Sequence, residues 1–590
     1  MSNPEYGKLA ERMDSLPKEK RALMQQRLAA RRPVGYDIVA QSLRECGLTH
    51  IYGVAGLPTE QILPACDRQQ IRPIGVYHHT SSVCMATAQN YQSGGLVAAA
   101  LVSAGPAITN AMTGILVARD NGWPVIVLGG SRTFFQRFDV LPMISHLTKH
   151  AIAAPSTGSI NECIQRACQI AVSGRPGPVY VDLHEDVLTG RADAAPVCVT
   201  RPVVPERALT ATNVEIERVA AALLSAQNPA LLLGKGIRWA GTEAPAQIQD
   251  LIETLGLPFI TSPMGRGFIS DDHPLCFNHA RSVLQSQADV VLILGARLNW
   301  VFRLGAELSR DTQVFQVDVH QSDEDQSAIQ TDFVHADAGD FVSRLVNVLK
   351  SRQDEVSDIK RQQHMKDWHN TLQTVSDETQ RLLDRRMDSN ERPMSPYRMM
   401  KEVREALPRN SICITEGNVS MMSAQPVIPA FLPASRMDAG TNACMGVGIP
   451  FAIGAKVACP DRPVVAVSGD YGFSLSAMEM EVCVRHGIPI VVVVANNQGN
   501  NGALKQNSYF PGDNSDLVTM FQPGLEYDQM MKMFGGQGET ITDPSLLKSA
   551  VKKAIAADKP CCINVVIDSQ MPLPNAWGQQ SAAHGGGDSG

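Results

Sequence analysis

Short runs of β-branched and aliphatic residues alternate with amphipathic stretches along most of this 590-residue chain. In the clearest case, two apolar runs at 464–467 and 488–495 flank a stretch at 474–485 whose apolar residues recur at helical spacing. Gly487 is typical of the end of such a helix. The order strand, helix, strand predicts a parallel βαβ unit, so the polar turns after the two strands lie at one edge of a sheet.

These two polar turns carry oxygen donors suited to a metal. Asp470 follows the first strand and offers an anionic oxygen, whereas Asn497 and the backbone carbonyl of Gly499 follow the second and offer neutral ones. An octahedral magnesium ion accepts such ligands and takes the rest from phosphate and water. The free N–H groups of a helix that begins near Ser474 favour a diphosphate at the same place. An ordinary Rossmann crossover is the alternative interpretation.

The same alternation recurs in three blocks, which predicts an α/β protein with three doubly wound parallel-sheet domains. The length of the chain also suggests about three domains of roughly 150 to 200 residues. We place them at 34–195, 202–349 and 395–575, with a charged helical connector at 350–394. The candidate strands of the first two domains are 50–56, 72–78, 96–106, 123–130, 177–183, 229–236, 288–296 and 313–319.

The two ends of the chain differ in composition from the domains. Residues 1–33 are highly charged, with Leu and Met at roughly helical spacing, and predict a helical arm that is either solvated or docked on a partner. Residues 576–590 are of low complexity, and we expect them to be disordered.

Composition and charge disfavour several classes of function. With 44% hydrophobic and 19% charged residues the chain is an ordinary globular one, and we find no segment long and apolar enough to span a membrane. The net charge of −7 disfavours a nucleic-acid or anionic membrane surface as the main partner. The first domain lacks the G-x-G-x-x-G pattern that would indicate a nicotinamide enzyme.

The cysteines bear on the cellular compartment. The 13 cysteines are scattered apart from Cys561 and Cys562, which are adjacent in a likely strand, and they show neither a C-x-x-C pair nor zinc-ligand spacing. Free thiols in a reducing compartment are therefore the simplest interpretation. The first residues do not resemble a signal peptide, and the last three match no peroxisomal address. We therefore expect a cytoplasmic protein.

Several motifs resemble those of the thiamine diphosphate-dependent decarboxylases and acetolactate synthases, across nearly the whole of 34–575. Gly-Asp at 469–470 and Asn-Asn at 496–497 have the spacing of their magnesium–diphosphate motif. The motifs similar to the oxalyl-CoA decarboxylase and 2-hydroxyacyl-CoA lyase branch are TSPMGRG (261–267), GARLNW (295–300), TEG (415–417), DAGT (438–441) and MGVG (445–448). Residues 135–139 and 148–150 resemble the acetolactate synthase pattern more.

The resemblance implies that thiamine diphosphate lies between the first domain of one subunit and the third domain of its neighbour, in a homodimer or homotetramer. It implies that Met421 is a bulky wedge under the bent cofactor, although a Met is equally typical of core filling. Gly446 and Gly448 either let backbone approach the cofactor or simply form a tight turn. The implied cofactor-binding residues are Val419, Met421, Met445, Gly446, Gly469, Tyr471, Gly472, Asn497 and Asn500.

On the substrate side, the resemblance implies that Leu57 lies in a loop over the reactive ring of the cofactor and that Gln136 is an active-site glutamine. Arg297 is either an anion clamp or part of a structural ion pair. The middle domain of the CoA-using branch holds a nucleotide, and Gly-Lys-Gly at 234–236 suits CoA or ADP. Tyr509 and Phe510 follow the metal turn and suggest a lid.

One position departs from the family pattern. Such enzymes activate the cofactor with a glutamate at the start of the helix after the second strand, whereas this chain has His78 and His79 there. Counting back from Tyr91 places the glutamate position at His79, and residues 69–119 contain no Asp or Glu. A neutral imidazole is a weaker acid than a carboxyl group and promotes activation less.

Three explanations of this departure stay open: a histidine takes the role, water or substrate activates the cofactor more slowly, or the protein binds the cofactor without turnover. For either histidine, the plain alternative is a helix-start residue that bonds nearby backbone.

Together these features predict a thiamine diphosphate- and magnesium-dependent lyase or carboligase acting on a small-molecule 2-oxo acid or acyl-CoA-type donor through a carbanion or enamine on the cofactor. An oxalyl-CoA decarboxylase or 2-hydroxyacyl-CoA lyase proper is one alternative, but Asn500-Asn501 replace tyrosines that this branch carries after the metal turn. A non-catalytic regulatory subunit is the alternative from another class.

Overall fold

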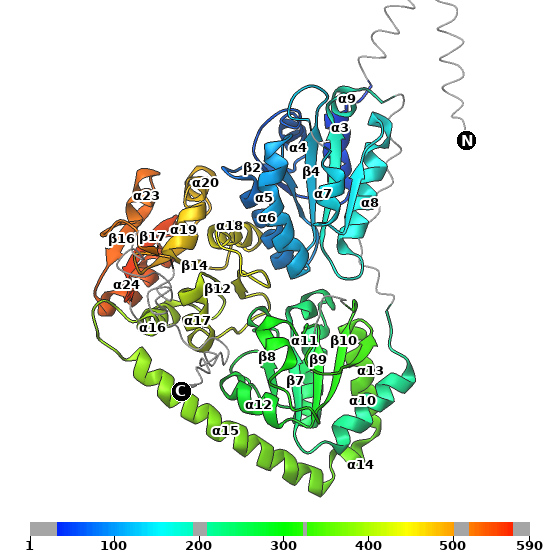
Figure 1. Cartoon of the computed structure of the whole chain (residues 1–590), viewed down its shortest axis with the longest axis vertical. Helices are drawn as coiled ribbons and strands as arrows, with labels where there is room; N and C mark the ends of the chain where they lie inside the picture. The colour runs from blue at the N-terminus through cyan, green and yellow to red at the C-terminus, as the bar shows by residue number, and fades with distance from the viewer. Residues whose placement is uncertain (1–31, 138, 193–208, 322–326, 501–518, 570–590) are drawn as a thin grey trace, which may run out of the picture.

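A computed structural model of the chain describes residues 32–137, 139–192, 209–321, 327–500 and 519–569. Within these ranges it contains three α/β units, each built on one parallel sheet (Figure 1). The three predicted doubly wound domains are thereby confirmed as a fold class. The predicted arm, apart from residues 32 and 33, and the predicted disordered tail lie outside the described residues and stay predictions.

The first unit has a six-stranded sheet in the order β2-β1-β3-β4-β6-β5. Its strands are β1 (His50–Gly53), β2 (Arg72–Gly75), β3 (Ala98–Leu101), β4 (Val125–Ser131), β5 (His150–Ala153) and β6 (Pro178–His184). Its helices are α3 (Gly35–Glu45), α4 (Ile62–Arg68), α5 (His79–Ser93), α6 (Pro106–Asn121), α7 (Leu141–Ser145), α8 (Ile160–Val172) and α9 (Glu185–Thr189). All five predicted strands are present, and edge strand β5 was not predicted.

The middle unit has a five-stranded sheet in the order β11-β10-β9-β7-β8. Its strands are β7 (Pro229–Leu233), β8 (Phe259–Thr261), β9 (Val290–Leu294), β10 (Gln313–Asp318) and β11 (Asp332–His335). Its longer helices are α10 (Asn213–Ser225), α11 (Ala244–Leu255), α12 (Arg281–Gln287) and α13 (Ala338–Ser351). The predicted charged connector is mainly the 29-residue helix α15 (Ile359–Met387), which runs along the outside of the molecule to the third unit (Figure 1).

The third unit has a six-stranded sheet in the order β13-β12-β14-β15-β17-β16. Its strands are β12 (Ile412–Glu416), β13 (Arg436–Asp438), β14 (Val464–Gly469), β15 (Val491–Asn496), β16 (Gln537–Ile541) and β17 (Cys561–Val566). Its helices are α16 (Pro396–Ala406), α17 (Asn418–Val427), α18 (Gly448–Ala458), α19 (Asp470–Ser476), α20 (Glu479–His486), α23 (Asp528–Met533) and α24 (Pro544–Ala556).

The helix between β14 and β15 differs from the prediction of one helix beginning near Ser474. It starts at Asp470 and consists of two pieces, α19 and α20. Gly469 is the N-cap in an extended conformation, and the carboxylate of Asp470 accepts the N–H of Tyr471 at 2.8 Å. This local bond lets the helix begin directly at the end of the strand.

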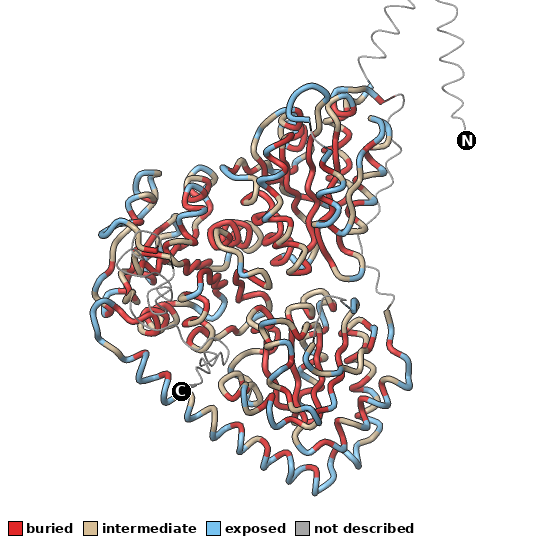
Figure 2. The backbone as a smooth tube through the Cα atoms, in the orientation of Figure 1, coloured by how far each residue is buried: buried red, intermediate tan, exposed pale blue. Residues whose placement is uncertain are grey.

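The first and third units share one hydrophobic core, formed largely where α5 packs against α18. Trp123 stacks on Tyr91 at 4.6 Å between ring centroids and lies 5.3 Å from Phe451 of α18. A Cβ on Gly454 would lie only 2.2 Å from the carbonyl oxygen of Met85, so only glycine lets the two helices approach this closely. Figure 2 shows buried backbone concentrated in the three sheets and between these two units.

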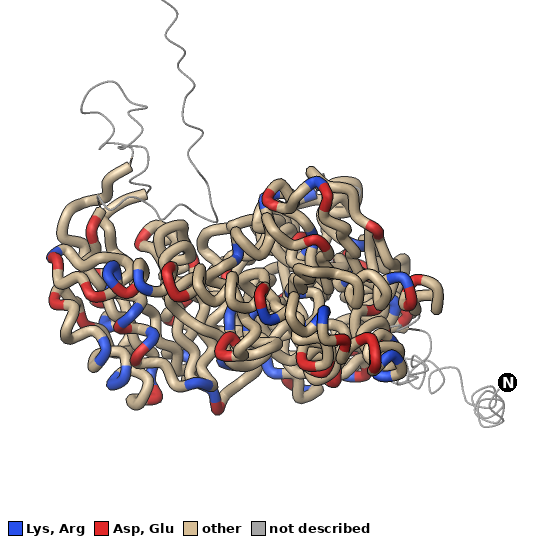
Figure 3. Tube along the Cα trace, turned by 90° about the horizontal axis from the view of Figure 1, so that it is seen from below, with Lys and Arg blue, Asp and Glu red and all other residues tan. Residues whose placement is uncertain are grey.

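Basic and acidic residues are interspersed over the face shown in Figure 3. Among the described residues, no helix combines the length and hydrophobicity that crossing a membrane requires.

The contact between α5 and α18 yields a stability prediction. Gly454→Ala should lower the free energy of unfolding by about 2 kcal/mol, because overpacking a tight helix contact forces backbone apart. Thermal unfolding measures this as a lower Tm. The matched control is Gly95→Ala, whose added Cβ would meet nothing within 4 Å. Equal melting temperatures for the two variants would contradict the role given to Gly454.

Candidate cofactor-binding and active site

The third sheet reverses its strand order between β12 and β14, and the loops after these strands meet there. Gly417 begins the first loop, with a φ of +85° that favours glycine. A Cβ on Gly417 would lie 3.3 Å from the backbone nitrogen of Gly469, which ends β14. In open α/β sheets, such a reversal is where ligands bind.

The structure brings together the three residues predicted as metal ligands. The N–H of Gly499 donates to the Asp470 carboxylate at 3.0 Å. One terminal atom of the Asn497 amide lies 3.1 and 3.3 Å from the two Asp470 carboxylate oxygens and 2.9 Å from the Gly499 carbonyl oxygen. If this atom is the amide nitrogen, it donates hydrogen bonds to the three oxygens. If it is the amide oxygen, four oxygens lie close together, and a cation bound between them would offset their repulsion. The donor set therefore fits magnesium.

The electrostatics of Asp470 agree with a cation site. Its side chain is 1% exposed, and burial raises the pKa of its carboxyl to about 7, although backbone N–H groups partly oppose this. A nearby cation would favour the charged form again. The described residues contain no cluster of three or more His, Cys, Asp or Glu side chains that could hold a metal, so a metal here depends on neutral oxygens beside Asp470.

A second buried carboxylate, Glu416, organises the glycine turn before α18. It is fully buried and accepts the N–H groups of Gly446, Val447 (3.2 Å) and Gly448 (2.7 Å). A Cβ on Gly448 or Gly472 would lie 2.4 or 2.7 Å from a Glu416 carboxylate oxygen. These glycines are therefore required by the carboxylate, which ties the Gly446 turn to the start of α19.

In the first unit, the predicted substrate-side residues Leu57 and Gln136 both contact the turn at 104–105. The N–H of Ala104 donates to the carbonyl oxygen of Leu57 at 3.2 Å. A Cβ on Gly105 would lie 2.7 Å from that of Gln136, which has a φ of +56°. This turn follows β3, next to the reversal between β1 and β3 in the first sheet. Leu57 is 52% exposed.

The two histidines at the start of α5 differ from each other. His78 is the N-cap, and its Nδ1 accepts the N–H of Thr80 at 3.2 Å, which is the plain structural role. His79 has an Nε2 that is shielded from water and has no hydrogen-bond partner among the residues that the structure describes. Burial, together with the neighbouring His78, lowers the pKa of His79, so its imidazole is neutral at pH 7.

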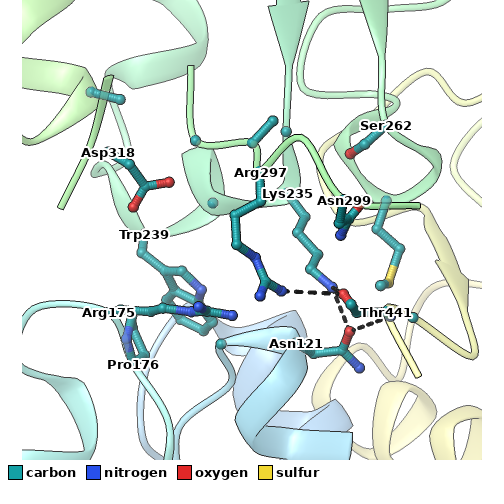
Figure 4. Close-up of a pocket in the computed structure, with 18 of the residues that line it drawn as sticks. Asn121, Arg175, Pro176, Lys235, Trp239, Ser262, Arg297, Asn299, Asp318 and Thr441 are labelled. Carbon is teal, nitrogen blue, oxygen red and sulfur yellow. Dashed lines mark hydrogen bonds between the residues drawn. The ribbon is translucent and has the colours of Figure 1, made fainter. Parts of the chain in front are cut away.

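A cavity of about 160 Å³ lies where the three units meet (Figure 4). The middle sheet reverses between β7 and β9, and the loops at 234–236 and 295–297 form one wall. These loops touch, since a Cβ on Gly234 would lie 2.1 Å from the carbonyl oxygen of Gly295. Asn121 of α6 and Thr441 of the third unit line the opposite side.

The cavity is rich in cationic and aromatic side chains: Arg175, Lys235, Arg297, Trp239 and Trp300 line it, with Asp318. Lys235 donates to Asn121 Oδ1 and, at 3.1 Å, to Thr441 Oγ1. Burial and, to a lesser extent, Arg297 lower the pKa of Lys235. Arg297 donates to the Asp120 carbonyl at 2.6 Å and to Thr441 Oγ1 at 3.4 Å. Among the described residues, the hydrogen-bond acceptors of Arg297 are thus a backbone carbonyl and a hydroxyl, and neither is charged. The structural ion pair that the sequence left open for Arg297 would need a charged acceptor.

Comparison with known proteins accounts for all three units. Residues 34–139 match the N-terminal TPP binding domain of thiamine pyrophosphate enzymes, 216–345 their central domain and 416–565 their C-terminal TPP binding domain. The chain is also similar over its length to individual enzymes. The 2-hydroxyacyl-CoA lyase of Arabidopsis thaliana is 31% identical over 90% of this chain and 95% of its own length.

The chain belongs to the family of thiamine pyrophosphate enzymes. The 2-hydroxyacyl-CoA lyase 1 of Mus musculus is 30% identical over 91% of this chain and 94% of its own length. The oxalyl-CoA decarboxylase of Escherichia coli (strain K12) is 29% identical over 90% of this chain and 95% of its own length. The protein is thus a thiamine diphosphate-dependent enzyme of the lyase and carboligase type.

The residues at the two sheet reversals fit thiamine diphosphate. The oxygen cluster at Asp470 suits a diphosphate bridged by a cation, and the unpaired Nε2 of His79 offers one polar atom to a ring nitrogen. Gly446 has a φ of +85°, and Met445 beside it is half-buried. In this family the cofactor supplies a carbanion equivalent that makes or breaks a C–C bond next to a carbonyl.

Not all predicted cofactor residues cluster with Asp470. Met421 is 7% exposed, packs in the core shared by the first and third units, and lines the three-unit cavity with Met422. The wedge and the core-filling alternative both agree with this placement. Val419 is half-buried beside another core cluster.

The other predicted cofactor residues lie close to Asp470 in the chain or beside Asn497 and Gly499: Gly469, Tyr471, Gly472 and Asn500. The Asn500 N–H donates to the Thr519 carbonyl. Tyr509 and Phe510 lie outside the described residues.

The sequence analysis missed two features of this site. Glu416 was noted only as part of the TEG motif, and its role in holding the turn at 446–448 was not predicted. The two glycines of that turn were the available signal, because closely spaced glycines indicate a tight turn whose backbone N–H groups need an acceptor. Ala443, before Met445, has a φ of +48°, an uncommon conformation for a residue with a Cβ. Sequence carries no signal for such local strain.

The raised pKa of Asp470 gives a pH prediction for the metal-free, cofactor-free protein. Because this carboxyl has a pKa of about 7 when folded and about 4 when unfolded, its protonated form favours folding at low pH, and that contribution is lost as pH rises to 7. Compared with Asp470→Asn, wild type should lose relative Tm between pH 5 and pH 8. Magnesium with thiamine diphosphate should restore it at pH 8. A Tm difference that is constant across this range would contradict the buried, metal-free carboxyl.

Proposed function

We propose that this protein is a magnesium- and thiamine diphosphate-dependent lyase or carboligase that acts on a 2-oxo acid or an acyl-CoA. The observation that carries the proposal is the convergence of Asp470, Asn497 and Gly499 at the reversal of the third sheet. Magnesium would take the Asp470 carboxylate, the Asn497 amide oxygen and the Gly499 carbonyl, and phosphate oxygens would complete its shell.

His79 is proposed to contact the cofactor ring in place of the glutamate expected from the family resemblance. Its neutral imidazole holds one proton and one lone pair, so it can donate or accept a hydrogen bond at Nε2. Leu57 and Gln136 lie at the same sheet edge and are proposed to cover the reactive ring and orient the substrate.

An acyl-CoA is favoured as one class of substrate. The three relatives described above are named for CoA substrates. The cavity with Lys235, Arg297 and two tryptophans would bind the phosphates and adenine of CoA or ADP through charge and stacking.

We further propose a homo-oligomer whose active site is shared between subunits. The apolar side chains Leu57, Tyr77, Phe135, Leu475 and Met478 are exposed at the edges where the site residues lie. A second copy would cover them, and a dimer is the smallest assembly that does so.

The first test is binding and turnover. Wild type should bind thiamine diphosphate in a magnesium-dependent way by calorimetry, and Asp470→Ala should abolish that binding because the anionic ligand is gone. A panel of 2-oxo acids and acyl-CoAs should release carbon dioxide or an aldehyde, or form an acyloin. Retained binding in the variant contradicts the site; binding without any turnover favours the regulatory alternative.

The second test restores the family residue. His79→Glu should speed exchange of the C2 proton of bound thiamine diphosphate by about ten to a hundredfold, because a carboxyl group is the stronger acid toward the ring nitrogen. Proton NMR with a deuterium quench measures this rate. His78→Glu is the matched control, since His78 already bonds its own backbone. An unchanged rate in His79→Glu would remove His79 from the ring contact.

A further inference from the structure

The segment that presents the two histidines is held by a helix of the third unit. Residues 72–78, from β2 to the cap of α5, lie along α20. Arg72 donates to the carbonyl oxygen of His486 at 3.2 Å, and Arg485 donates to that of Gly75 at 2.9 Å. The third contact, at Glu479, lies next to the histidines themselves.

Glu479 accepts hydrogen bonds from the free backbone donors at the start of α5. One carboxylate oxygen takes the N–H of Tyr77 at 3.2 Å and the other takes that of His78 at 3.0 Å. The Ser81 side chain also bonds the carboxylate. Glu479 is 1% exposed, so these bonds are shielded from water, and leaving their buried donors without an acceptor would cost free energy.

The contacts with Glu479 fix both the position and the orientation of the backbone at 77–78. Because both oxygens of one carboxylate hold two successive N–H groups, the backbone at 77–78 cannot rotate without breaking a bond. His79 is the first residue of α5 and follows this pair directly. The orientation of its unpaired Nε2 therefore depends on a side chain from another unit of the chain.

We propose that Glu479 is a positioning residue that holds His79 in its orientation toward the cofactor ring. This inference rests on the proposed function for its catalytic meaning, but the clamp itself is a property of the cofactor-free chain. Glu479 also lies on the helix that follows α19, whose first residue is Asp470. One short stretch of chain thus carries a ligand of the proposed metal and the clamp on the proposed activating group.

The test uses Glu479→Gln in the full-length protein, with Glu402→Gln as the matched control. Glu402 is a buried carboxylate of the same unit, 6% exposed and paired with Arg398 at 2.7 Å. Within the part of the chain that the structure describes, it makes no hydrogen bond or ion pair with residues 72–79. Arg485→Ala removes an independent point of the clamp and remains informative if Glu479→Gln folds poorly.

The first readout is amide hydrogen–deuterium exchange of the cofactor-free protein. Peptides covering 74–82 should exchange about tenfold faster in Glu479→Gln, because an amide offers one acceptor oxygen where the carboxyl group offers the N–H groups of 77 and 78 one each. They should exchange faster to a lesser degree in Arg485→Ala, which loses its bond to Gly75. Glu402→Gln should leave these peptides unchanged. Unchanged exchange in both clamp variants overturns the proposal.

The second readout separates positioning from binding in the presence of magnesium and thiamine diphosphate. Glu479→Gln should change the cofactor Kd less than about threefold, since the Asp470 site is intact, and slow exchange of the cofactor C2 proton about tenfold. A C2 exchange rate equal to that of wild type, with loosened peptides, overturns the positioning role. If wild type itself fails to bind thiamine diphosphate, the proposed function fails, whereas the exchange of peptides 74–82 still decides whether the clamp exists.

Discussion

The close packing of α5 on α18 is the constraint on which the site depends. Gly454 lets the backbone of α18 lie against the carbonyl of Met85, and the aromatic group around Trp123 fills the space beside it. Each helix begins with functional residues: α5 at His79 and α18 after the Gly446 turn. Because the two helices pack tightly in one core, their first residues cannot move independently of each other. This contact therefore sets the relative positions of the functional residues of the first and third units.

Three buried carboxyl groups of the third unit, those of Glu416, Asp470 and Glu479, have different roles. Glu416 and Glu479 accept backbone N–H groups from two or more residues and so hold segments of chain in place. Asp470 also accepts N–H groups, but it lies beside the Asn497 amide and the Gly499 carbonyl oxygen, which complete a donor set that fits a cation. The difference is in the neighbours, because burial raises the pKa of all three.

Sequence patterns predicted the parts of the fold with strong periodicity. The long apolar strands β4, β7, β9 and β15 and the connector helix α15 were all anticipated. Among the strands that were not predicted, β5, β11 and β16 are short, lie at sheet edges and are mostly half-buried, so their apolar signal is weak. Strands β8 and β13 were also missed; they are buried edge strands of only three residues each, too short to show a periodic pattern. The metal turn was predictable because the ends of adjacent parallel strands must meet. The contact of Glu479 with His78 was not, since it joins residues 401 apart and needs the packing of two units.

If His79 takes the place of the family's glutamate, as the resemblance implies, the chemistry at this position changes. Burial lowers the pKa of this imidazole, so the protein keeps it neutral and spares the site a positive charge. A neutral imidazole can both give and accept a hydrogen bond, whereas an ionised carboxylate only accepts. Such a group acts through its orientation more than through its acidity. An enzyme that depends on orientation needs a rigid support for that residue, and the carboxylate of Glu479 under the first turn of α5 is placed to supply it.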